Sequence, residues 1–299
     1  SYIKPHWPYI APDPYHSMYK GAELPNANKH IKEKETAHPV YRAFMNMEIG
    51  KTFSRDDVRQ TVLPAYMGLI KEIDDQLARV IDHLKENQLL ENTLIVFTSD
   101  HGDYMGDHWL GEKEMFHEPS VSVPLIIVDP DPKADSTRGQ VDDRLVEGID
   151  ILPTMLDALN VNVPMQRIEG QSLLAKIRGQ ADVKPWRQAA FSEIDYSYYQ
   201  ARLELGIEPS QARAYMLKTH DWKYVYYKGF RPQLFDLKND PHELEDLGES
   251  KNTQSIRSEF QGELLERLTD RRNRVTISDD TVRERTAGAE KVGIIIGRW

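Results

Sequence analysis

Asp100 and His101 are the residues whose types and position in the sequence point most directly to chemistry. They follow the apolar run from Leu94 to Phe97, which is typical of a strand buried on both faces. In open α/β sheets, ligands bind just beyond the carboxyl ends of strands. A carboxylate supplies a hard anionic oxygen and a neutral imidazole supplies nitrogen, so this pair is suited to hold a metal ion. Gly102 would let the chain turn sharply there.

A polar loop follows this pair and ends at a second apolar run, residues 123–128. The loop is rich in Gly, His and Asp and includes Lys113, and loops of this kind carry functional residues on rigid scaffolds. One alternative is that Asp100 and His101 only form a turn, because Asp and Gly often do so after a strand. The density of ionisable residues between two strongly apolar segments favours the metal site.

The clearest predicted helix precedes the first strand and runs from Pro64 to Asn87. Pro64 suits the first turn of a helix. Apolar residues at helical spacing predict a buried stripe, which comprises Ile70, Ile73, Leu77, Val80, Ile81 and Leu84. The helix and the buried strand after it indicate an α/β layer. Upstream, residues 21–53 are predicted to form a long polar loop with room for one short helix, a length typical of functional loops.

A further helix is predicted after Asp150, which suits an N-cap, with Pro153 in its first turn. Its predicted buried stripe comprises Leu152, Met155, Leu156 and Leu159. From Lys184 the pattern changes to short β segments, predicted at residues 189–198, 214–219, 222–227 and 233–236. A tight turn at 219–221 would join the middle pair. An amphipathic helix over 256–268 would pack on this small sheet.

The composition limits the class of protein. The chain has 299 residues, of which 39% are hydrophobic and 29% charged, as in soluble globular proteins. The net charge of -10 argues against nucleic acid as a partner, because a nucleic-acid binder needs a basic face. No apolar run approaches the roughly 20 residues of a membrane helix. The chain has no cysteine, which excludes disulfides and thiol chemistry within it.

Several motifs together resemble the sulfatase branch of the alkaline-phosphatase superfamily, especially the phosphonate monoester hydrolases. SDHGD (99–103), GDHWLGEK (106–113) and PLII (124–127) look like the second metal-binding half of that family. KPHWPY (4–9) is similar to its Lys/Arg-Pro-His-x-Pro motif, and QLFDLKNDPHE (233–243) to its Leu-Tyr/Phe-Asp-Leu-x-x-Asp-Pro-x-Glu signature. The resemblance implies an α/β fold, a partial alkaline-phosphatase/sulfatase-like sandwich with a smaller C-terminal α+β subdomain built on an antiparallel sheet.

The resemblance also implies roles for four residues. Asp100 and His101 match two ligands of one divalent metal ion, with Mn²⁺ or Ca²⁺ expected. Lys113 and His6 match groups that contact the esterified anion or the leaving oxygen. Composition alone would favour His6 as a packed loop histidine, and a plain surface lysine is the alternative for Lys113. The family's nucleophile is a formylglycine made from a Cys or Ser motif, which this sequence lacks, so it is expected outside this chain.

These expectations define a function and its alternatives. We expect a metal-dependent hydrolase of phosphonate monoesters, phosphodiesters or sulfate esters, acting on a small anionic ester. The alternatives are an aryl or alkyl sulfatase proper, a two-zinc phosphodiesterase or phosphomutase of the same superfamily, and a non-catalytic relative that keeps the fold as a binding module. A metal count would separate one-metal from two-metal enzymes.

The ends of the chain carry the remaining expectations. Because the sequence starts at Ser1 rather than Met, we expect a C-terminal portion of a longer protein that is inactive alone. Residues 1–183 would form the C-terminal half of the catalytic domain and residues 184–299 would form the C-terminal subdomain. The apolar tail Val292–Trp299 is expected to be buried, either on the body of this chain or, as we favour, against another subunit of a homo-oligomer. We expect no membrane partner and a cytoplasmic location, with a signal peptide left open by the missing start.

Overall fold

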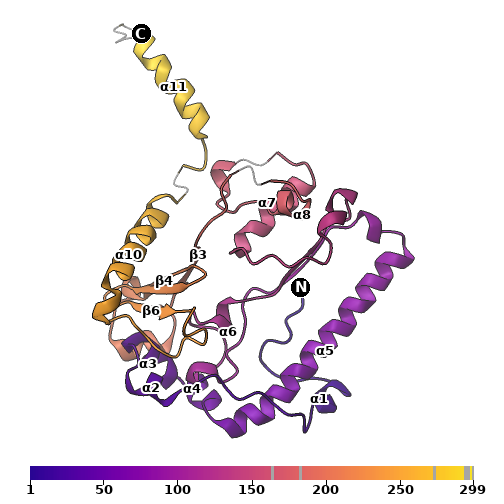
Figure 1. The fold of residues 1–299 in the computed structure, drawn as a ribbon, viewed down its shortest axis with the longest axis vertical. Coiled ribbons are helices and arrows are strands. Elements are labelled where there is room, and N and C mark those ends of the chain that lie inside the picture. Colours follow the sequence, from indigo (N-terminus) through magenta and orange to yellow (C-terminus); the bar gives the residue numbers. More distant parts are fainter. Residues whose placement is uncertain (163–164, 182–183, 272–273, 293–296, 298–299) are drawn as a thin grey trace. The chain divides into compact units, whose positions relative to one another are not determined.

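The computed structural model describes residues 1–162, 165–181, 184–271, 274–292 and 297 (Figure 1). Contacts divide the chain into two compact units. The larger unit comprises Ser1–Pro132 and Arg187–Gln261, and the smaller unit comprises Lys133–Trp186 and Gly262–Trp299. Each unit thus combines two separate segments, whereas the predicted domains divide the sequence at one position. That predicted division stays a prediction.

The two strands around the predicted site pair with each other in the larger unit. β1 (Ile95–Thr98) and β2 (Leu125–Val128) are antiparallel, with Ile95 opposite Val128 and Thr98 opposite Leu125. The predicted burial of both strands is wrong for the described chain: no residue of β1, which was predicted to be buried on both faces, is fully buried, and in β2 Ile126 is 58% exposed and Val128 is 41% exposed. These apolar side chains lie on a face that no described residue covers fully.

The long helix α5 begins earlier than its sequence pattern predicts. It spans Asp56–Glu86, so Pro64 lies inside it rather than in the first turn. Its first turns are anchored by Arg59, which is buried and donates to the Met105 carbonyl. The predicted buried stripe is wrong in part, because Ile70 and Val80 are exposed. The buried positions lie nearer the N-terminus, at Arg59, Leu63, Ala65, Gly68 and Leu69.

The short helix α1 (Tyr15–Met18) packs against α5, and Figure 1 shows the two lying together. A Cβ atom at Gly68 would lie 2.1 Å from the Tyr15 carbonyl oxygen, so only glycine permits this approach. The Tyr15 hydroxyl donates to Asp75 Oδ2 over 2.8 Å. These contacts fix the N-terminal segment along the helix.

The segment 21–53 is largely helical, so its prediction as a loop is wrong. It contains α2 (Ile31–Glu35), α3 (Pro39–Asn46) and α4 (Glu48–Phe53). Two histidines cap these helices: the Nδ1 atoms of His30 and His38 accept from the backbone N–H groups of Lys32 and Val40. Histidine is not among the usual N-cap residues, which explains why the helix starts went unrecognised.

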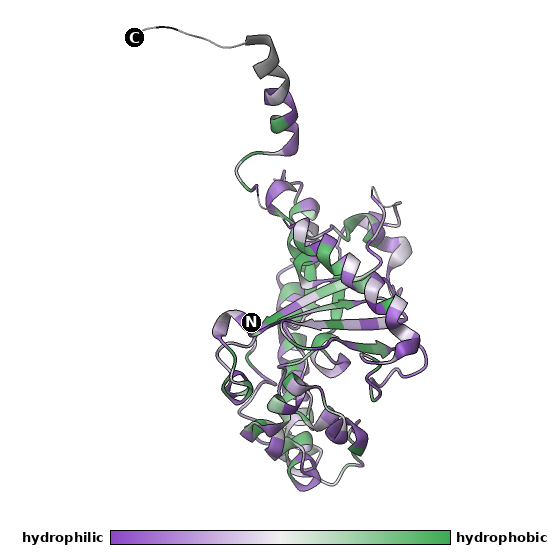
Figure 2. Cartoon of the chain, turned by 90° about the vertical axis from the view of Figure 1, so that its left-hand side faces the viewer, coloured by the Kyte–Doolittle hydropathy of each residue, from purple (hydrophilic) through white to green (hydrophobic). Residues whose placement is uncertain are grey.

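The predicted small sheet is confirmed. β3 (Ala190–Asp195), β4 (Arg213–Lys218), β5 (Trp222–Tyr227) and β6 (Gln233–Asp236) form an antiparallel sheet in that order. The predicted tight turn joins β4 to β5, with Thr219 N–H donating to the Trp222 carbonyl over 2.8 Å. Green, apolar stretches run along strands in Figure 2. Apolar residues of β4 and β5 form one core with α3, including Val40, Phe44, Met216 and Val225.

Helical segments complete the described chain. α6 (Glu118–Val121) precedes β2, α9 (Gln200–Leu205) contacts α3, and α10 (Gln254–Thr269) confirms the helix predicted over 256–268. Phe260 of α10 stacks on Tyr224 with ring centres 5.8 Å apart. Short 3₁₀ segments lie at Leu90–Asn92, Asp107–Trp109, Pro132–Thr137, Gly148–Asp150, Met165–Arg167, Pro209–Gln211 and Lys251–Thr253. Among the described helices, none is both long and apolar enough to cross a membrane.

The smaller unit contains α7 (Ile151–Ala158), α8 (Leu174–Ile177) and α11 (Asp279–Val292). Asp150 lies at the predicted N-cap, but its carboxylate accepts from Gln171 and Glu147 N–H groups instead of capping α7. The predicted stripe of α7 is wrong, because Leu152, Met155 and Leu159 are exposed. Thr154 is buried instead, and its hydroxyl accepts from Leu173 N–H. Most of the tail beyond Val292 lies outside the described residues, so its burial stays a prediction.

Tyr196 offers a test of the core of the larger unit. It is fully buried beside Phe44, and no described group hydrogen-bonds its hydroxyl. Because an unpaired buried hydroxyl costs about 1–3 kcal/mol, Tyr196→Phe should raise the free energy of unfolding by about 1 kcal/mol in urea titrations. The matched control is Tyr227→Phe, which removes a 2.6 Å hydrogen bond to Gln233 and should destabilise. A destabilised Tyr196→Phe variant would show that the hydroxyl has a partner.

Candidate functional site

The structure brings the four predicted site residues into one cluster within the larger unit. Asp100 and His101 follow β1, His6 comes from the N-terminal segment, and Lys113 comes from the loop before α6. Lys113 Nζ lies 2.9 Å from His6 Nε2. The ring centres of His6 and His101 are 5.6 Å apart, and His101 Nε2 lies 3.8 Å from Asp100 Oδ2. Three segments distant in sequence therefore meet at one place.

Hydrogen bonds to backbone carbonyls assign the same tautomer to both histidines. Nδ1 of His101 lies 2.8 Å from the Gly102 oxygen, and Nδ1 of His6 lies 2.8 Å from the Trp7 oxygen. A carbonyl oxygen can only accept, so Nδ1 carries a proton in each ring, and in the neutral imidazole Nε2 then keeps its lone pair. Nε2 of His6 uses that lone pair to accept from Lys113, while Nε2 of His101 is available to a ligand.

Asp100 and His101 fit part of a coordination shell for a divalent ion. The Asp100 side chain is 88% exposed; its Oδ1 accepts from His101 N–H. Its Oδ2 and the His101 Nε2 atom face each other, and a carboxylate oxygen with an imidazole nitrogen suits Mn²⁺ or similar ions. Within the described ranges, no group of three His, Cys, Asp or Glu residues is arranged to hold a metal ion. Further ligands would have to come from elsewhere.

Tyr9 joins the two loops that carry the histidines. Its hydroxyl donates to Asp103 Oδ2 over 2.8 Å, which ties the segment after His6 to the segment after His101. Asp103 Oδ1 accepts from the Met105 N–H, and burial raises the pKa of this carboxyl. Tyr9 is a further residue of the site, beyond the four that the sequence predicts. The signal was present, since Tyr9 ends the KPHWPY motif and Asp103 ends SDHGD.

Ser120 of α6 joins the segments of Lys113 and His101 in a similar way. Its hydroxyl donates to the Lys113 carbonyl over 2.5 Å, and its own carbonyl accepts from Gly102 N–H over 2.7 Å. A Cβ atom at Gly102 would lie 2.0 Å from the Pro119 oxygen, so glycine is required by this packing as well as by the turn. Sequence reasoning missed Ser120, because a lone serine before an apolar strand carries no signal.

Glu114 adds a titratable group next to Lys113. Its carboxylate accepts from the Lys113 N–H over 3.0 Å, and its side chain is buried. Burial, with the nearby charge of Glu112, raises the pKa of Glu114 to about 7. The charge on this carboxyl therefore changes near neutral pH. The carboxyl is hydrogen-bonded to the backbone N–H of Lys113, a predicted catalytic residue.

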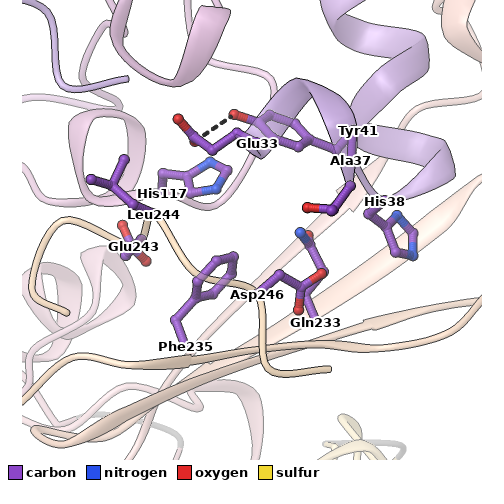
Figure 3. A pocket seen from close by; sticks show the side chains of 11 residues that line it. Glu33, Ala37, His38, Tyr41, His117, Gln233, Phe235, Glu243, Leu244 and Asp246 are labelled. Atoms are coloured by element: carbon purple, nitrogen blue, oxygen red, sulfur yellow. Dashed lines mark hydrogen bonds between the residues drawn. The ribbon is translucent and has the colours of Figure 1, made fainter. Parts of the chain in front are cut away.

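A small pocket of the larger unit contains none of the four predicted residues (Figure 3). Two of its acidic lining residues, Glu33 and Asp246, already have partners. Glu33 accepts from His30 N–H and lies 2.7 Å from His108 Nδ1, and Asp246 pairs with Arg231 at 2.7 Å.

His38, on the wall of this pocket, predicts a pH dependence of stability. Burial lowers the pKa of its imidazole from 6.5 to about 4. Below pH 6.5 the unfolded chain binds a proton that the folded chain does not, so the free energy of unfolding should fall between pH 6.5 and 4, by roughly 3 kcal/mol in all.

The variant His38→Asn tests this expectation, because it keeps a capping acceptor but cannot titrate. Urea unfolding at pH 7 and 4.5 should show a smaller loss for His38→Asn; an equal loss would contradict the assignment.

The sequence is similar to sulfatases and to related proteins of known family. A sulfatase family model matches residues 1–161, and a model of the C-terminal region of N-sulphoglucosamine sulphohydrolase matches residues 106–271. The multifunctional alkaline phosphatase superfamily protein PehA of Trinickia caryophylli is 34% identical over 266 residues, which cover 82% of this chain and 50% of that protein. An arylsulfatase of Clostridium perfringens is 30% identical over 253 residues, covering 83% and 48% respectively. The chain thus spans about half the length of these relatives.

Solved structures give the same result. The phosphonate monoester hydrolase SpPMH of Silicibacter pomeroyi has a TM-score of 0.82 and 29% identity, covering 92% of this chain and 56% of that chain. The phosphonate monoester hydrolase of Agrobacterium radiobacter has a TM-score of 0.80 and 28% identity, covering 89% and 55%. This likeness confirms the predicted fold class, including the small antiparallel sheet in the C-terminal part.

Proposed function

The chain belongs to the sulfatase family of the alkaline phosphatase superfamily, and from this premise we propose that the protein hydrolyses small anionic esters, with phosphonate monoesters and phosphodiesters as the first substrates to test. The observation that carries the proposal is the meeting of Lys113, His6 and His101 with Asp100 in one cluster. In this proposal Lys113 is the cation, His6 transfers a proton, and Asp100 and His101 are metal ligands. Metal-dependent ester hydrolysis can employ groups of all three kinds.

Lys113 and His6 supply the contacts to the substrate. The Lys113 ammonium would face the transferred anionic group, where negative charge grows in the transition state. His6 Nε2 accepts from Lys113 in the resting site. Once protonated, His6 could donate to the leaving oxygen and stabilise it as the ester bond breaks. The Nδ1 hydrogen bond to the Trp7 carbonyl holds the imidazole in the orientation that this role needs.

Asp100 and His101 would hold one divalent ion. Such an ion, when bound, neutralises charge on an ester oxygen and favours an ionised nucleophile. In our proposal the nucleophile is a formylglycine that lies outside these 299 residues, because the chain has no cysteine and no serine version of the motif. The contribution of this chain is to place two ligands, a cation and an imidazole around the reacting group.

A sulfate-ester hydrolase is the second candidate, and the arylsulfatase of Clostridium perfringens favours it. Sulfate and phosphonate monoesters are similar tetrahedral anions, and Lys113 and His6 could serve either. A two-zinc phosphodiesterase would need more His and Asp ligands than the described residues bring together. A non-catalytic relative would keep the fold without turnover.

Paired assays test the proposal. The longest natural protein that carries this chain should be purified and assayed on matched aryl phosphonate, phosphodiester and sulfate substrates, before and after removal of metal. We expect metal-dependent hydrolysis of at least one, and no turnover by the isolated residues 1–299. Absence of turnover on all three would favour a non-catalytic relative. Robust turnover by residues 1–299 alone would overturn the formylglycine mechanism.

A further inference from the structure

The short helix α6 (Glu118–Val121) holds the two site loops from one side. Through Ser120 it donates to the Lys113 carbonyl and accepts from Gly102 N–H. The backbone of Pro119 also packs directly on Gly102. A shift of α6 would therefore move the backbones of Lys113 and His101 together. The residues that hold α6 in place therefore also affect the positions of Lys113 and His101.

The four-stranded sheet fixes α6 from the opposite side. Lys223 of β5 donates to the Phe116 carbonyl over 2.8 Å and to Glu118 Oε1 over 2.7 Å. Glu243, after β6, accepts from Glu118 N–H over 2.7 Å and lies 2.5 Å from Lys223 Nζ. In Figure 1, α6 lies next to β6 of this sheet. The contacts reach backbone atoms on both sides of residue 117, so they determine where α6 starts.

The charges of Lys223 and Glu243 are buried, so each needs a partner of opposite charge. The Lys223 side chain is 0% exposed and that of Glu243 is 1% exposed. A buried charge without its partner is strongly unfavourable, so each member requires the other and the α6 backbone in register. Lys218 also contacts Glu118, at 2.7 Å, but its side chain is 23% exposed, and within the described part of the chain it does not bond to Glu243 or Phe116. It therefore offers a matched control on the same sheet.

We propose that Lys223 and Glu243 are positioning residues: by clamping the start of α6 to the C-terminal sheet, they set the distance between Lys113, His6 and His101. This inference rests on the proposed function for its kinetic consequence, whereas the placement of the side chains can be tested without any substrate. It also gives a physical role to Glu243, the last residue of the Leu-Phe-Asp-Leu-x-x-Asp-Pro-x-Glu signature.

Ring-nitrogen resonances of His6 and His101 test the placement directly. In ¹⁵N-labelled protein, Nε2 of His6 should carry the signature of accepting from Lys113. Glu243→Ala and Lys223→Met should shift the ring signals of His6 and His101, Glu243→Gln should shift them less because its amide oxygen can still accept from Glu118, and Lys218→Met should leave them unchanged. Ser120→Ala, which keeps the buried charges intact, should shift them with little change in melting temperature.

Kinetics on a hydrolysed ester provide the second measurement. Since misplacement by about 1 Å can cost up to 10²-fold in rate, Glu243→Ala should lower kcat by about 10- to 100-fold with KM within about threefold. Lys218→Met should stay within about twofold. Shifted ring signals in a protein that hydrolyses no ester would sustain the positioning role and refute the proposed function. Unchanged ring signals in folded Glu243→Gln and Ser120→Ala would overturn the positioning role, whatever the activity.

Discussion

Replacing Lys113 with Ala in the active protein should lower kcat by about 10²- to 10³-fold and leave KM nearly unchanged, because loss of one preorganised donor to a developing anion has costs of this size. Lys113 Nζ lies 2.9 Å from His6 Nε2, so the same change also frees the His6 imidazole. The charge that Lys113 stabilises grows mainly in the transition state, which is why binding should suffer less than turnover. Initial rates over a range of substrate concentrations separate the two constants.

The comparison variant for Lys113 is Lys71→Ala, which removes a lysine on α5 that pairs with Asp74 and Asp75. It should change neither constant by more than about twofold, because surface ion pairs contribute little. Should Lys113→Ala keep the turnover of the unmodified protein, Lys113 would have to be an ordinary surface lysine, the alternative that the composition leaves open.

Replacing Asp100 with Asn should reduce turnover by about 10³-fold at limiting metal concentration and restore part of it in excess metal. Loss of the carboxylate charge weakens the metal site without removing the oxygen atom, and a metal ion supplies several kcal/mol of charge stabilisation in such reactions. The Asp100 side chain is 88% exposed, so the substitution should hardly change the melting temperature. Activity as a function of metal concentration gives the measurement.

Asp82→Asn provides the control for Asp100, since it removes an exposed carboxylate from α5 whose nearest cation, Lys85, is 3.5 Å away. Its metal dependence should match that of the unmodified protein. A metal dependence of Asp100→Asn that also matches would mean that Asp100 is not a ligand and only turns the chain after β1.

The parts of the fold that sequence predicted well have local signals. The small sheet follows from four short β segments, and the turn at 219–221 fixes its middle hairpin. The cluster of Asp100, His101, Lys113 and His6 was expected from motifs, and the structure brings these residues together. Their chemical roles stay predictions.

The predictions that the structure contradicts failed for physical reasons. α5 begins at Asp56 despite Pro64, because tertiary contacts of Arg59 and Leu63 stabilise the turns before the proline. Two of the three helices within residues 21–53, α2 and α3, begin at histidine caps, which sequence rules do not anticipate. Glu243 lies more than 100 positions from Glu118, and it contacts Lys223 of β5 from the loop after β6, so no periodicity encodes these pairs.

The number of metal ions bound per chain tests the central claim most directly. The longest natural protein that carries this chain should be purified, dialysed and analysed by elemental mass spectrometry together with its Asp100→Ala variant. We expect one divalent ion per chain in the unmodified protein and a clear loss in the variant. Two ions per chain, or one ion that Asp100→Ala retains in full, would contradict a single metal site built on Asp100 and His101.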